Sequence, residues 1–161
     1  MCGDGKLAQA TRLWQEGCQS LSDGNVKKAI ELYTRSIEVC PTAEGYTFRG
    51  WAMSFEGRVD EAISECMKAI DVDSSFGNPY NDIGCYLMQQ GDLDEAVVWL
   101  QRAKQAIRYE SPHFPYLNLG RIFVIHEMYA AALKEFEQAQ KLHPHDPVAG
   151  AAIRALKKAI Q

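Results

Sequence analysis

No stretch of this sequence approaches the roughly 20 consecutive apolar residues that a membrane-spanning helix needs. The opening residues, MCGDGKLAQATRLW, also lack the apolar core of a secretory signal. Cys2 occupies the position where N-myristoylation requires glycine, and no apolar stretch precedes it as in a bacterial lipoprotein. The sequence therefore predicts a cytoplasmic protein that neither spans a membrane nor is anchored to one.

Positive charge and paired cysteines are also scarce. The chain has 17 Lys and Arg residues against 21 Asp and Glu residues, a formal net charge of -4 at pH 7. Binding of nucleic-acid phosphates relies on a basic surface, so nucleic acid is not an expected partner. The five cysteines are odd in number and form no C-x-x-C pair, which predicts reduced thiols and no zinc site built on cysteine.

A repeated pattern of glycine and alanine dominates what is present. Steps of 33, 34 and 36 residues separate four alanines: Ala29, Ala62, Ala96 and Ala132. Twelve residues before each alanine stands a glycine: Gly17, Gly50, Gly84 and Gly120. Glycine makes up about 7% of an average protein, so four glycines in one register are not expected by chance. The 161 residues therefore predict a single domain built from four copies of one unit.

Each copy predicts two short helices that cross closely. Helix axes normally lie about 8 to 10 Å apart, and glycine on the first helix facing alanine on the second permits a closer contact. Between the helices, Gly24, Gly57 and Gly91 can adopt the left-handed conformation that ends a helix. Asn25 and Asp92 are predicted to cap the helices that follow.

The larger residues around these positions follow the pattern of a known family. The third copy carries Tyr80, Ile83, Gly84, Leu87, Ala96 and Leu100, and the fourth carries Tyr116, Leu119, Gly120, Phe123, Ala132, Phe136 and Pro144. The first carries Leu13, Gly17, Ala29, Tyr33 and Pro41, and the second carries Tyr46, Gly50, Ala62 and Ala69. This spacing resembles the tetratricopeptide repeat, a helix pair of about 34 residues. The resemblance covers about residues 10–144.

The resemblance implies an all-α fold, a right-handed α-α superhelix of four helix-turn-helix repeats and a C-terminal capping helix, forming one domain over residues 1–161. The repeats are expected at about 10–42, 43–76, 77–110 and 113–146. The capping helix is expected at 147–160, with Asp146 as its N-cap and Pro147 as its first residue. Glu127 departs from the pattern, because it replaces the turn glycine of the fourth copy, which predicts a strained or differently shaped turn.

In this family the first helix of each repeat lines a concave groove that binds extended peptides or short helices. By register, the groove should present Trp14, Gln15, Cys18, Thr47, Phe48, Trp51, Phe55, Asn78, Asn81, Asp82, Cys85, Phe114, Asn118 and Arg121. Exposed rings would anchor a ligand, but packing between neighbouring helices explains Trp51 and Phe55 equally well. Asn118, with Asp82 at the equivalent position, resembles part of the asparagine ladder of O-linked N-acetylglucosamine transferases, and a solvated polar face is the alternative.

Some members of the family bind the acidic C-terminal tails of chaperones through lysine, asparagine and other basic residues. The matching positions here are Trp14, Cys18, Phe48, Asn78 and Asp82. None of these is basic and one is acidic, so an acidic tail would meet little positive charge. The resemblance therefore implies a protein-interaction scaffold or adaptor whose ligand is a peptide or protein other than an acidic chaperone tail.

Catalysis is not expected from this sequence. It contains no Gly-rich phosphate loop, HExxH motif or nucleophile elbow, so neither an enzyme nor a cofactor is predicted. His143, His145 and Asp146 lie in an H-P-H-D sequence, but a complete metal site needs three or four ligands, so no metal is predicted. Two alternatives to the adaptor stay open: a self-associating subunit whose groove holds residues 1–9, and the non-catalytic arm of a larger enzyme. A monomer or weak homo-oligomer is expected.

Overall fold

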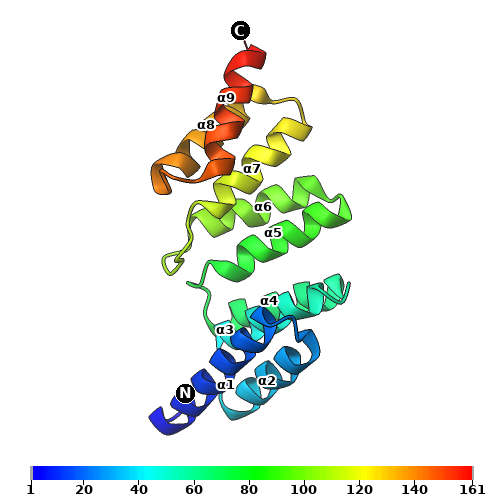
Figure 1. Ribbon diagram of the computed structural model, residues 1–161, viewed down its shortest axis with the longest axis vertical. Coiled ribbons are helices and arrows are strands. Elements are labelled where there is room, and N and C mark those ends of the chain that lie inside the picture. Colours follow the sequence, from blue (N-terminus) through cyan, green and yellow to red (C-terminus); the bar gives the residue numbers. More distant parts are fainter. Residues whose placement is uncertain (1, 161) are drawn as a thin grey trace.

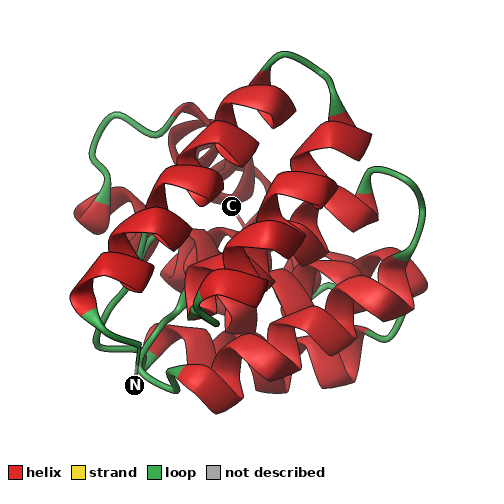
Figure 2. Cartoon of the chain, turned by 90° about the horizontal axis from the view of Figure 1, so that it is seen from below, coloured by secondary structure: helices red, strands yellow, loops and turns green. Residues whose placement is uncertain are grey.

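Four pairs of antiparallel helices and one final helix follow one another along residues 2–160, the part of the chain that the computed structural model describes (Figure 1). The pairs are α1 (Asp4–Ser22) with α2 (Val26–Val39), α3 (Ala43–Ser54) with α4 (Val59–Val72), α5 (Asn78–Gln90) with α6 (Leu93–Lys104), and α7 (Phe114–Ile125) with α8 (Tyr129–Leu142). The last helix, α9 (Pro147–Ile160), packs on α8. Each helix contacts mainly its neighbours in sequence, so the pairs stack into the predicted all-α superhelix, seen along its length in Figure 2. None of these helices is both long and apolar enough to cross a membrane.

The glycine and alanine pattern produces a close contact within each helix pair. A Cβ atom at Gly84 would lie 2.6 Å from Cγ of Leu100, and one at Gly50 would lie 2.9 Å from the backbone oxygen of Ala62. Real Cβ atoms do not approach other heavy atoms this closely, so neither position accepts a side chain without movement of its neighbours. The predicted role of these glycines is confirmed.

The turns within the pairs use left-handed backbone. The φ angles of Gly24, Gly57 and Gly91 are 79°, 76° and 88°. Glu127 adopts the same region with a φ of 58°, although a residue with a Cβ atom pays roughly 1 to 2 kcal/mol for this conformation. Loss of the glycine has therefore strained the fourth turn without moving it out of the left-handed region.

The two predicted helix caps differ in outcome. The side chain of Asn25 accepts a hydrogen bond from the backbone nitrogen of Lys28 at 3.3 Å, as expected of an N-cap. Asp92 makes no such bond, so the prediction of a side-chain cap there is wrong. Asp94 and Glu95 stand in the first turn of α6 instead, where their charges complement the helix dipole.

The connection between α6 and α7 is tied to the preceding repeats by Arg108. Its backbone nitrogen donates to the carbonyl of Ser75 at 3.0 Å, and its carbonyl accepts from the nitrogen of Gly77 at 2.9 Å. The guanidinium forms ion pairs with Asp73 at 2.7 Å and with Glu44 at 2.6 Å. The connection between α6 and α7 therefore contacts α3 and the connection between α4 and α5.

A disulfide joins Cys2 to Cys40, whose Cα atoms are 5.9 Å apart. The expectation of reduced thiols is therefore wrong for these two residues and holds for Cys18, Cys66 and Cys85. Counting cysteines could not reveal the pair, because it forms only when the antiparallel packing of α1 and α2 brings the start of one helix to the end of the other.

Candidate partner-binding groove

The first helices of the second, third and fourth pairs enclose a hollow of about 500 Å³, called here the main hollow. Its lining consists of Thr47, Phe48, Trp51, Asn78, Asn81, Asp82, Cys85, Tyr109, Phe114, Asn118 and Arg121. Most of the side chains that register placed on the concave face are thus brought together in one space. Tyr109 was missed, because it comes from the connection between α6 and α7 and not from a repeat helix.

A second hollow of about 420 Å³ continues the groove toward α1. It is lined by Leu7, Thr11, Trp14, Thr42, Glu44, Phe48, Phe76, Asn78, Arg108 and Glu110. Phe48 and Asn78 line both hollows, so the groove extends from α1 to α7. Nε1 of Trp14 and Oδ1 of Asn78 are buried and have no hydrogen-bond partner within residues 2–160. A buried polar atom without a partner costs free energy, which a ligand recovers only if a side-chain movement exposes the atom to it.

Four of the expected groove residues lie outside the main hollow: Trp14, Gln15, Cys18 and Phe55. Trp14 lines only the second hollow, and Phe55 follows the end of α3. Cys18 points toward the interior of the first pair, where the hydroxyl of Tyr33 donates to its sulfur at 3.5 Å. Burial raises the pKa of the Cys18 thiol. In the folded chain, the side chain of Cys18 therefore packs between α1 and α2.

At the α1 and α3 end of the groove, four aromatic rings form a row. Ring centroids are 5.1 Å apart for Trp14 and Phe48, 5.9 Å for Phe48 and Trp51, and 5.4 Å for Trp51 and Phe55. These are the separations of favourable tilted and edge-to-face pairs. Trp51 is 44% exposed and Phe55 is 59% exposed, so these ring contacts bury only part of each side chain. The outer half of the row presents apolar surface to solvent.

At the α5 and α7 end, the lining side chains are held by hydrogen bonds. Nδ2 of Asn118 donates to Oδ1 of Asn81 at 3.0 Å and to the sulfur of Cys85 at 3.2 Å. Arg121 donates to Oδ1 of Asn118 at 3.0 Å. The ladder therefore runs from Asn118 to Asn81 and not through Asp82, the partner that register suggested. Both amides are buried, yet each keeps bonding capacity for one more group.

Asp82 is a partly buried carboxylate in the main hollow. Burial raises its pKa to about 7, an effect that the neighbouring Asn81 side chain partly offsets. It forms no ion pair with any cation in the described part of the chain. A partly buried carboxylate without an ion-pair partner favours a ligand that supplies a positive charge.

Comparison with known proteins finds similar repeats in other chains. A family model described as tetratricopeptide repeat matches residues 43–76 and 78–108. Small glutamine-rich tetratricopeptide repeat-containing protein 2 of Mycosarcoma maydis is 35% identical over 100 residues, which are 62% of this chain and 28% of that protein. The matched part of this chain thus spans a little over a quarter of that relative.

Solved structures agree on the fold. The pilF protein of Pseudomonas aeruginosa gives a TM-score of 0.90 at 24% identity, covering 97% of this chain and 71% of that one. The second TPR of Spaghetti (RPAP3), bound to the HSP90 peptide SRMEEVD, gives 0.58 at 26% identity, covering 62% of this chain and 94% of that one. The repeat spacing, the stacked helix pairs and these similarities agree, and they identify tetratricopeptide repeats in this chain.

Proposed function

We propose that this chain is a non-catalytic adaptor that holds an extended segment of a partner protein in the groove between α1 and α7. The observation that carries the proposal is the main hollow, where half-exposed rings stand beside amides with unused hydrogen-bonding capacity. Aromatic anchors supply much of the binding energy at protein interfaces. Side-chain amides bond to a peptide backbone without requiring a particular sequence.

The ligand we propose carries an apolar side chain and, close to it, a basic group. The apolar side chain would lie between Trp51 and Phe114, which are both 44% exposed and line the same hollow. The basic group would pair with Asp82. This residue lies on α5, lines the main hollow and has no ion-pair partner among the described residues. Transfer of an ammonium or guanidinium group into this hollow is favoured only because the carboxylate is there.

An acidic tail such as the one bound to the RPAP3 domain is disfavoured as the ligand of this groove. Ionised Asp82 would repel it, and Arg121, which lines the main hollow, supplies a single positive charge against the several carboxylates of such a tail. Arg108 lines the second hollow, but it is paired with Asp73 and Glu44. We therefore place this chain apart from the chaperone-tail binders in its choice of partner.

A selection from a library of random peptides tests the proposal. The intact chain should enrich peptides with an aromatic or large aliphatic residue next to Lys or Arg, and Trp51→Ala should not. Tyr129→Ala is the matched control, because Tyr129 is an exposed ring on α8, away from the lining of either hollow. Enrichment of the same peptides by Trp51→Ala would move the binding site elsewhere, and enrichment of acidic peptides would overturn the proposed charge preference.

Self-association is the alternative that the sequence left open. Residues 4–9 belong to α1, and Cys2 is bonded to Cys40, so this segment is not an extended strand available to another copy. We propose a monomer on this basis. Light scattering over a wide range of concentrations measures it, and a mass that doubles with concentration would favour an assembly subunit.

A cytoplasmic location is also a proposal, and the disulfide bears on it. Cytosolic thiols are normally kept reduced, whereas the pair formed by Cys2 and Cys40 is oxidised. Cells can be lysed directly into denaturant that contains an alkylating reagent, because Cys66 is buried in the folded chain, and the modified cysteines counted by mass spectrometry. A cytosolic protein should show all five cysteines modified, whereas modification of only Cys18, Cys66 and Cys85 would place the chain in an oxidising compartment.

A further inference from the structure

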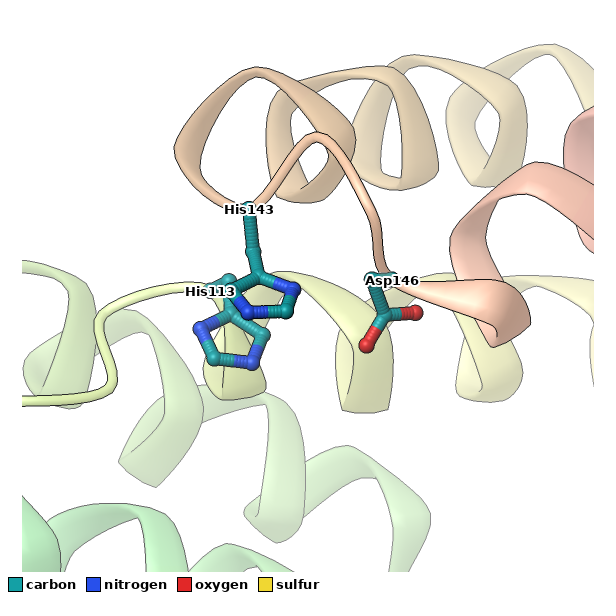
Figure 3. Close-up of side chains that lie close together, drawn as sticks. All are labelled: His113, His143 and Asp146. Atoms are coloured by element: carbon teal, nitrogen blue, oxygen red, sulfur yellow. The ribbon is translucent and has the colours of Figure 1, made fainter.

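A second group of polar side chains lies outside the groove, where the start of α7, the end of α8 and the start of α9 meet. His113 precedes α7, His143 follows α8 and Asp146 precedes α9, and one ligand atom of each lies within 4.8 Å of the others. Figure 3 shows the two imidazole rings one above the other, with the carboxylate of Asp146 beside them. The ring centroids are 4.6 Å apart. The H-P-H-D sequence suggested His145 as the second imidazole, but the fold brings His113 there.

Two of the three groups are already positioned by the protein. Oδ1 of Asp146 accepts a hydrogen bond from the backbone nitrogen of Ala149 at 2.7 Å, which orients the carboxylate and leaves its second oxygen outside that bond. His113 is only 9% exposed, and its ring packs on Phe114 at 4.4 Å. Side chains that are held in place by an outer layer of contacts are typical of metal ligands.

We propose that His113, His143 and Asp146 bind one divalent transition-metal ion of the class to which zinc belongs. Imidazole nitrogen and carboxylate oxygen are zinc ligands at about 2.0 to 2.2 Å, and three protein ligands leave a fourth position for water. Calcium and magnesium are not expected, because they take oxygen ligands and not imidazole.

The ligand atoms need to move only a short way to form this site. In a tetrahedral site with these bond lengths they would lie about 3.3 to 3.5 Å apart, so the longest separation shortens by a little over about 1 Å. His143 is exposed and Asp146 is partly exposed, which leaves room for their side chains to rotate. Because the two imidazole rings are stacked at an interplanar angle of 16°, the exposed ring of His143 must also turn so that its nitrogen lone pair faces the ion.

Such an ion would join the start of α7 to the connection between α8 and α9, where the backbone nitrogen of Asp146 already donates to the carbonyl of His143 at 3.0 Å. The unfolded chain separates His113 from the other two ligands, so the ion binds the native form and stabilises it. It would hold the capping helix α9 to the fourth helix pair. It would also fix the start of α7, where Phe114 enters the main hollow.

Titration of the purified full chain with zinc chloride, after treatment with EDTA, tests the site. Calorimetry should give one equivalent bound, and the thermal midpoint should rise as zinc is added. Asp146→Asn is the most informative variant, since asparagine keeps the cap on Ala149 but loses the charged ligand. It should weaken zinc binding at least tenfold, as should His143→Ala.

His145→Ala is the matched control, because His145 is two residues from His143 and outside the cluster. It should bind zinc as the unmodified chain does. Cobalt as a second probe reports the ligand type through its visible spectrum, which separates a site of nitrogen and oxygen from one that uses the free thiols. Absence of binding, equal affinity in His143→Ala and His145→Ala, or a cobalt spectrum of thiolate ligation would each overturn the proposal.

Discussion

At the α1 and α3 end of the groove, aromatic rings touch one another and remain half exposed, whereas at the α5 and α7 end buried amides are joined by hydrogen bonds. Apolar contact is non-directional, so the exposed rings add binding surface at little cost to the fold. The amides must be satisfied in the folded chain, so they serve stability and recognition at once. A change at the aromatic end should therefore affect mainly binding, and a change at the amide end should affect both.

The largest expected effect is the loss of Asn118. Asn118→Ala leaves the buried Oδ1 of Asn81 without its partner, which costs about 1 to 3 kcal/mol, and it removes one hydrogen bond from the exposed Arg121. We expect the free energy of unfolding in urea to fall by about 2 to 3 kcal/mol. Asn78→Ala is the control, because Oδ1 of Asn78 has no partner among the described residues and should lose little. Equal losses in both variants would contradict the assigned role of the ladder.

The next largest effect separates binding from folding at the aromatic end. Trp51→Ala should weaken binding of a selected peptide by roughly 30-fold, about 2 kcal/mol, as expected of an aromatic anchor. Because the ring is 44% exposed, the free energy of unfolding should change by less than about 1 kcal/mol. Fluorescence polarisation and urea denaturation measure the two quantities. A large loss of stability would assign Trp51 to the core and remove the contrast between the two ends.

The pH dependence of the main hollow provides a third test. The pKa of Asp82 is raised to about 7, so the folded chain binds a proton here that the unfolded chain releases near pH 4. The contribution of Asp82 to stability is therefore full below about pH 4 and is lost as the pH rises through about 7. Binding of a peptide with Lys or Arg should change in the opposite direction and strengthen across the same rise, by about tenfold or 1.4 kcal/mol.

Asp82→Asn should remove the contribution of Asp82 to both dependences, while His113, whose pKa is lowered by burial, keeps its own contribution to stability in both proteins. Cys85, beside Asp82 in the hollow, has a pKa raised to about 12 by burial, and the pKa of Tyr109 is also raised by burial, so neither titrates between pH 5 and 8. Midpoints of urea unfolding and peptide affinities at pH 5 and pH 8 measure the effect. A pH profile that is unchanged in Asp82→Asn would show that another group is responsible.

The smallest effect is expected at Phe55. It is the most exposed ring of the row and lies outside the main hollow, in contact with Trp51. Phe55→Ala should reduce peptide affinity by less than about threefold, or 0.7 kcal/mol, and should leave unfolding nearly unchanged. A loss as large as that of Trp51→Ala, measured with the same peptide, would extend the groove beyond the end of α3.

The sequence predicted much of the groove, because register within a helix fixes which side chains share a face. It placed Trp51, Asn81 and Asn118 on the concave side, and all three line the main hollow. It failed to predict that Asn118 bonds to Asn81, because the relative rotation of α5 and α7 decides which of two neighbouring side chains meets it. Tyr109 was missed for another reason, since irregular connections have no period to follow.

By itself, the sequence determined the helix pairs, their left-handed turns and the final helix from Pro147, because these depend on local spacing and on residues such as Gly91 that act over one turn. Only the tertiary structure decided which distant side chains meet. The disulfide of Cys2 with Cys40 and the approach of His113 to His143 both arise where the ends of separate helices pack together. Such contacts depend on how rigid helices stack in space, and spacing along the chain does not encode that geometry directly.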